Sequence, residues 1–119
     1  LFLYGDCAAL TPEELESELR MKRSGIKWRV LIQEGDTNIC YPIEDFRWFP
    51  KKFFKRNIQL VYGNKVAMGV DMDRSSHQTT KMIVIESAPL AESTRNLFDF
   101  IWDSCRKPTF TTAPKVYEF

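Results

Sequence analysis

The sequence predicts a domain of the α/β class, and three stretches of the chain lead to that prediction. Residues 1–33 contain an apolar run, an amphipathic helical pattern and a second apolar run. Residues 58–70 are two β-rich runs joined by Gly63-Asn64. This connection favours a hairpin, because both residues tolerate positive φ. Residues 87–105 carry one wide apolar stripe at helical spacing.

Composition places the chain among ordinary globular domains. It has 119 residues, 44% of them apolar and 28% charged, which is enough for one core. The formal net charge of +1 gives no electrostatic reason for nucleic-acid binding. The basic cluster at 51–56 is therefore interpreted as a rim of the sheet. Nothing approaches a membrane span or a signal peptide.

The three cysteines are odd in number and not closely paired in sequence. Cys7, Cys40 and Cys105 therefore predict neither a zinc site nor a disulfide framework, and a reducing cytoplasm is expected. Cys105 falls on an apolar stripe and is expected to be buried and inert. Cys7 and Cys40 fall in predicted loops, where sensing of oxidation is an open alternative.

The first third of the chain predicts a βαβ unit. Residues 1–4 are a candidate strand that starts at the very first residue of the sequence, so we expect an excised domain of a longer protein. A helix follows, with Thr11 as N-cap, Pro12 in its first position, Glu14 completing a capping box and Gly25 ending it. Residues 27–33 form the second strand, parallel to the first. Trp28, Val30 and Ile32 are placed on one face of this strand, and Arg29, Leu31 and Gln33 on the other.

The middle of the chain is less regular. Residues 34–52 are interpreted as a long, partly ordered loop with one helical turn at 43–46, and its aromatic residues favour a plug at the core edge over a functional loop. The hairpin strands are 58–62 and 65–70. Residues 71–80 are expected to form a polar loop, and 81–86 a buried strand.

The clearest helix is expected over 87–105. Ser87 is a plausible N-cap, and Pro89 lies in the first turn. Phe100 falls outside the apolar stripe, so another subunit or domain is expected to cover part of a second face of this helix. A tail at 108–119, extended or disordered, follows a domain at 1–107. The stripe consists of Leu90, Thr94, Leu97, Phe98, Ile101, Trp102 and Cys105.

Four short motifs in this order carry a resemblance. They are Ser-Gly-Ile-Lys-Trp-Arg-Val-Leu (24–31), Tyr-Gly-Asn-Lys-Val-Ala-Met-Gly (62–69), Ile-Val-Ile-Glu (83–86) and Leu-Phe-Asp-Phe-Ile-Trp (97–102). The chain resembles the phospholipase D-like effector domain of TrmB-type transcriptional regulators, which occur mainly in archaea. The resemblance implies half of a phospholipase D-like fold, a mixed β-sheet of about five to six strands with packed helices. It also implies a winged helix-turn-helix DNA-binding domain outside this chain.

The resemblance also indicates what is missing. The superfamily motif is His-x-Lys-x-x-x-x-Asp, with the Asp just before the hairpin glycine. Lys55, Asn57 and Tyr62 occupy the positions of the His, Lys and Asp. A protonated lysine is no nucleophile, so no catalytic residue and no enzyme activity are expected. The single histidine, His77, falls in a polar loop, and no metal or cofactor site is expected.

The resulting expectation is a non-catalytic ligand-sensing and dimerisation domain of a cytoplasmic transcriptional regulator. It would form a homodimer and reach DNA only through the absent domain. Its effector would be a sugar or an anion, bound where strand ends present sites. A purely structural dimerisation module without a ligand is the alternative. The candidate ligand-binding residues are Arg29, Asp45, Arg47, Trp48, Lys55, Asn57 and Tyr62.

Overall fold

The computed structural model describes residues 12–25, 28–55, 57–76 and 79–117. Over these residues the chain is of the α/β class, as predicted. Its elements are α1 (Pro12–Arg23), β1 (Val30–Gln33), the 3-10 turn η2 (Ile43–Asp45), β2 (Phe46–Phe49), β3 (Gln59–Tyr62), β4 (Lys65–Met72), β5 (Thr79–Glu86) and α2 (Ala88–Ser104).

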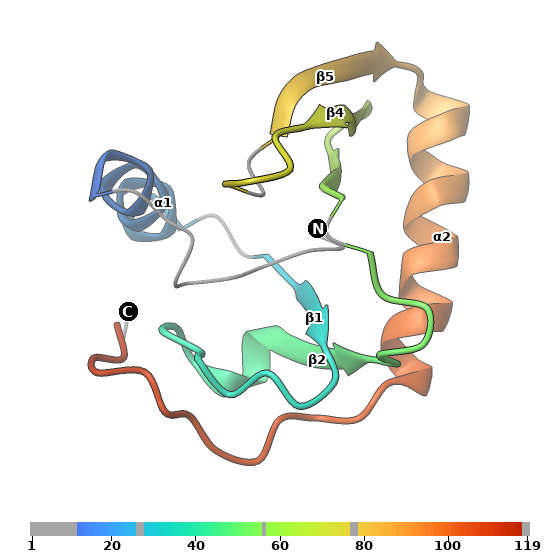
Figure 1. Cartoon of the computed structure of the whole chain (residues 1–119). Helices are drawn as coiled ribbons and strands as arrows, with labels where there is room; N and C mark the ends of the chain where they lie inside the picture. The colour runs from blue at the N-terminus through green and yellow to red at the C-terminus, as the bar shows by residue number, and fades with distance from the viewer. Residues whose placement is uncertain (1–11, 26–27, 56, 77–78, 118–119) are drawn as a thin grey trace.

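The described strands form two groups. β1 and β2 are parallel, and β3, β4 and β5 form an antiparallel sheet in that order. The long helix α2 runs along one side of the molecule, from the β3–β4–β5 sheet to the β1–β2 pair (Figure 1). Three predictions lie outside the described residues: the first strand at 1–4, the N-cap at Thr11 and the place of His77 in a polar loop.

The hairpin and both helices confirm the sequence predictions. Tyr62 pairs with Lys65 across the turn, where Gly63 adopts a φ of 54°. Gly25 follows α1 with a φ of 89°, the left-handed conformation expected of a helix-ending glycine. The side chain of Ser87 accepts a hydrogen bond of 3.2 Å from the backbone N–H of Leu90, so it caps α2 as predicted.

The prediction of a loop over 34–52 is wrong in part. The helical turn is present as η2, but residues 46–49 form a strand, β2, that pairs along the full length of β1. Alternation along β2 places Phe46 and Trp48 on one face and Arg47 and Phe49 on the other. The polar loop predicted at 71–80 is also shorter, because β4 reaches Met72 and β5 begins at Thr79.

The predicted burial of 81–86 is wrong as well. β5 is an outer strand of its sheet, and its central side chains are more than a third exposed. The apolar stripe of α2 is also only partly buried. Phe98 and Trp102 are in the core, whereas Leu97 is 61% exposed. Phe100, predicted to lie off the stripe, is 72% exposed.

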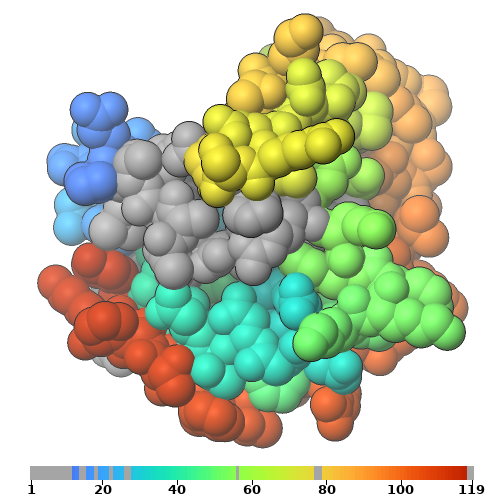
Figure 2. Space-filling view, viewed as in Figure 1, coloured from blue at the N-terminus to red at the C-terminus, as the bar shows by residue number. Residues whose placement is uncertain are grey.

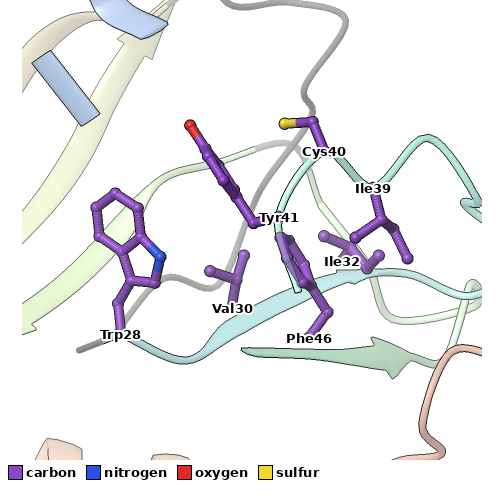
Figure 3. Packing of buried hydrophobic residues seen from close by; sticks show 7 residues of the cluster. All are labelled: Trp28, Val30, Ile32, Ile39, Cys40, Tyr41 and Phe46. Carbon is purple, nitrogen blue, oxygen red and sulfur yellow. The ribbon is translucent and has the colours of Figure 1, made fainter. Parts of the chain in front are cut away.

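Three groups of buried side chains form the core. The largest lies on one face of the β1–β2 pair and consists of Trp28, Val30, Ile32, Ile39, Cys40, Tyr41 and Phe46 (Figure 3). The second joins Leu31 to Phe98 and Trp102 of α2. The third joins Val61 and Val66 of the hairpin to Ala91 near the start of α2. One helix therefore covers both strand groups.

The segment after α2 is extended and packs against the chain ahead of β2. Its backbone donates hydrogen bonds from Thr112 N to Thr37 O and from Tyr117 N to Cys40 O, both of 2.7 Å. The ring of Tyr117 lies 6.2 Å from that of Tyr41, centroid to centroid. Figure 2 shows this segment in red beside the blue-green residues that follow β1.

Candidate functional site

Two of the predicted ligand residues, Arg29 and Arg47, meet at the C-terminal half of α2. Alternation along the strands places Arg29 on the same face as Leu31, and Arg47 on the same face as Phe49. Leu31 and Phe49 pack against Phe98 and Trp102 of this helix. The guanidinium carbons of Arg29 and Arg47 lie 5.5 Å and 4.8 Å from the centroid of the Trp102 ring. These distances are within the range of cation–π attraction, so Trp102 carries two cations on one ring system.

Arg47 is held by the end of the helix. Its Nη1 atom donates hydrogen bonds of 3.0 Å to the carbonyl oxygen of Trp102 and 3.1 Å to that of Cys105. The last carbonyls of a helix carry the negative end of its dipole, and that of Trp102 also accepts a 3.2 Å hydrogen bond from the backbone N–H of Cys105. The guanidinium therefore caps α2 from a neighbouring strand.

Arg29 is held by side chains of the same helix. Its Nη2 atom forms an ion pair with Oδ1 of Asp99, and its guanidinium lies 5.1 Å from the centroid of the Phe98 ring. The side chains of Arg29 and Asp99 remain 37% and 47% exposed. Solvent and small solutes can thus reach the ion pair of Arg29 and Asp99. Arg47, in contrast, is already bound to the carbonyls at the helix end.

Trp48 and Asp45 both donate hydrogen bonds to backbone carbonyls of the segment between β1 and η2. Trp48 points to the opposite face of β2 and packs against the largest core group. Its indole Nε1 donates a hydrogen bond of 2.8 Å to the carbonyl oxygen of Asp36. Asp45 ends the 3-10 turn η2, and its backbone N–H donates to the carbonyl of Pro42 at 3.0 Å. Trp48 therefore holds the loop that follows β1.

The remaining three predicted residues belong to the hairpin region. Lys55, Asn57 and Tyr62 are all exposed, and Tyr62 ends β3. The Oδ1 atom of Asn57 lies 2.8 Å from where a Cβ atom at Gly69 would stand, so this glycine admits the Asn57 side chain. The structure thus brings Arg29 and Arg47 together at α2, places Trp48 on the other face of β2 and Asp45 at the end of η2, and puts Lys55, Asn57 and Tyr62 in the hairpin region.

Sequence reasoning missed the partners that hold the arginines. Asp99 and the helix end at Trp102 are more than fifty residues away in the chain, and no short motif joins them to β1 and β2. One signal was available for Arg47. The last turn of α2 contains no basic residue, so a cation from another element was to be expected there.

The cysteines correct one prediction. Cys40 is disulfide-bonded, although the sequence predicted no disulfide framework. Odd number and wide spacing are weak evidence, because spacing along the chain does not set distance in the fold. Cys105 is a free thiol. Burial raises its pKa, and the nearby charge of Arg47 lowers it in part.

Neither a metal centre nor a membrane span emerges from the described parts of the chain. Within residues 12–25, 28–55, 57–76 and 79–117, no three His, Cys, Asp or Glu side chains are grouped to hold a metal ion. No helix there has the length and apolar character needed to cross a membrane. No protein-family model, curated protein or solved structure matches this chain.

Proposed function

We propose that this chain is a non-catalytic effector and dimerisation domain of a transcriptional regulator, with half of a phospholipase D-like fold. It would act as a homodimer, and its DNA-binding part would be a winged helix-turn-helix domain outside this chain. The support is the resemblance in four motifs, taken with the α/β architecture and the hairpin at the expected place.

The residues at the catalytic positions support a non-catalytic role. Tyr62 precedes the hairpin glycine, where the related enzymes carry Asp, and Asn57 stands in place of Lys. Lys55 stands in place of the nucleophilic His, so the imidazole that attacks phosphorus in the related enzymes is absent at this position. Phosphodiester hydrolysis by that mechanism has no nucleophile here.

Exposed apolar surface carries the proposal of dimerisation. Twelve large apolar side chains are exposed in the described chain, and four of them are consecutive, at residues 82–85. Single exposed apolar residues are ordinary, but such a concentration is typical of an interaction surface. The four are Met82, Ile83, Val84 and Ile85.

The arginine pair is where a ligand would act in the sensing form of this proposal. A small anion or an acidic sugar would compete with Asp99 for the partly exposed guanidinium of Arg29. Breaking that ion pair would change how α2 is held, and a ligand that favours one of two dimer arrangements shifts their populations.

A purely structural dimerisation module is the second candidate. It is favoured by the fact that Arg29 and Arg47 both have partners within the chain. An arginine that caps a helix is not available to a ligand unless the cap is given up. Under this alternative the arginines only hold α2 against β1 and β2.

Two measurements on the purified chain test these proposals. Sedimentation velocity over a wide concentration range is expected to show a reversible dimer, and a monomer at every concentration would contradict dimerisation. Thermal unfolding with a panel of sugars and anions is expected to show a shift that is lost in Arg29→Gln. If no compound shifts unfolding while the dimer persists, the structural module is the better description. Turnover of a phosphodiester substrate would exclude both.

A further inference from the structure

Among the residues that the structure describes, the outer strand β5 has an open backbone edge. β5 follows β4 at the end of the three-stranded sheet, and no described strand pairs with its other side. It is eight residues long, which is long for an edge strand. Natural proteins usually blunt such edges with proline, bulges or charged residues. Residues 82–85 contain neither a proline nor a charged residue.

The ladder between β4 and β5 shows which backbone groups face outward. The N–H of Ser87 donates a hydrogen bond of 2.9 Å to the carbonyl of Asn64, one pair beyond the β4–β5 register. Hydrogen-bonded and non-hydrogen-bonded pairs alternate in an antiparallel ladder. Counting back from Ser87, the N–H and C=O groups that point away from β4 belong to Met82, Val84 and Glu86.

The side chains of β5 are apolar and exposed on both faces of the sheet. Met82, Ile83, Val84 and Ile85 are 43%, 48%, 54% and 36% exposed, and successive side chains alternate between faces. The helix α2 packs against β3 and β4 instead. β5 thus offers apolar side chains and backbone groups that pair with no other described strand, along the same edge.

We propose that β5 pairs with β5 of a second copy of this chain, antiparallel and across a two-fold axis, so that two three-stranded sheets become one. This inference rests on the proposed dimerisation and names the surface that carries it. Side chains that lie directly opposite each other point to the same face of the sheet. The two-fold axis must therefore pass through a residue of β5, and not through the midpoint between two successive residues. With the axis at Ile83 or Val84, residues 82–85 of the two copies lie side by side.

The charges at the two ends of β5 favour antiparallel pairing with a second copy over parallel pairing. The apolar run is preceded by Lys81 and followed by Glu86. Antiparallel pairing brings the basic end of one strand beside the acidic end of the other. Parallel pairing would place Lys81 beside Lys81 and Glu86 beside Glu86, and adjacent like charges destabilise a sheet. The strand is thus complementary to itself in one direction only.

The test compares two charge insertions of the same kind. Val84→Lys places a cation in the paired strand, and Phe100→Lys places one on the exposed face of α2. Both native side chains are exposed, so both variants should fold, which circular dichroism and urea midpoints check. Val84→Lys is expected to weaken dimerisation about a hundredfold or more, because each dimer then opposes two cations at its interface. Phe100→Lys is expected to leave the dimer unchanged.

Hydrogen exchange gives an independent reading on the unmutated protein. Peptide amides in residues 79–87 are expected to exchange more slowly as protein concentration rises. A dimer that Phe100→Lys disrupts and Val84→Lys leaves intact would overturn β5 pairing but leave the proposed function standing. A monomer at all concentrations would overturn both. Protection of β5 only when a different protein is added would replace the second copy by that partner and overturn self-pairing.

Discussion

Arg47 of β2 donates a hydrogen bond of 3.0 Å from Nη1 to the backbone carbonyl of Trp102 in the last turn of α2. The same atom donates to Cys105 at 3.1 Å, and the guanidinium lies 4.8 Å from the centroid of the Trp102 ring. One side chain thus meets the charge of the helix end, two carbonyls and an aromatic face. It links the strand pair to the helix that spans both strand groups.

Arg47→Ala is expected to lower the free energy of unfolding by about 2 kcal/mol, because two carbonyls lose a charged donor. Arg47→Lys should recover only part of this, since an ammonium group lacks the planar fork and stacks less well on the ring. Urea unfolding followed by tryptophan fluorescence measures both. Arg106→Ala is the control. Its ion pair with Glu34 spans 3.1 Å between side chains that are 73% and 42% exposed, so a change within about 0.5 kcal/mol is expected. Equal losses for the two variants would contradict the capping role of Arg47.

The segment after α2 should contribute to stability through Tyr117. Its ring packs on the largest core group beside Tyr41. Tyr117→Ala is expected to cost about 1.5 kcal/mol from lost burial. Phe110→Ala, in the same segment, is expected to change stability by less than about 0.5 kcal/mol, because Phe110 is 54% exposed. Chemical denaturation compares the two. If they are equivalent, the packing of Tyr117 adds nothing measurable.

Local signals in the sequence predicted the hairpin and both helices. Gly63 and Ser87 carry their information in one or two positions, so no distant contact was needed to interpret them. β2 was missed because its four residues lie in an aromatic, proline-flanked stretch with no clear period. Pairing with β1 forms this strand, and pairing partners across a sheet are not written in local sequence.

Burial of β5 could not be predicted for a related reason. A β-branched apolar run is typical of a central strand, yet the position of a strand in its sheet is a tertiary property. The arginines show the same limit. Arg29 and Arg47 were candidates for binding a ligand, but their partners Asp99 and Trp102 come from a helix far along the sequence. Whether a charged residue binds a ligand or another part of the fold depends on such contacts.

Cys40 should resist alkylation in the folded protein without reductant, because it is disulfide-bonded. Reduction is expected to lower stability by about 2–4 kcal/mol, the usual range for loss of a native disulfide. Intact-mass analysis counts the thiols, and thermal unfolding with and without reductant measures the loss. Cys105→Ser should respond to reductant as the unmutated chain does. Rapid modification of Cys40 without reductant would show that the bond is absent and would favour the cytoplasmic assignment.

Cys105 should ionise at a higher pH in the folded protein than in the unfolded chain. Burial raises the pKa of this thiol, and the charge of Arg47 opposes that effect. Because the folded pKa is raised, its contribution to stability is full below the unfolded pKa and is lost as pH rises through the folded pKa. The rate of iodoacetamide alkylation at Cys105, followed by peptide mass analysis against pH, should therefore have a higher midpoint in buffer than in urea. Arg47→Ala should move the folded midpoint higher still, because it removes the opposing charge. A midpoint that falls, or that matches the urea value in both proteins, would contradict this account of the helix end.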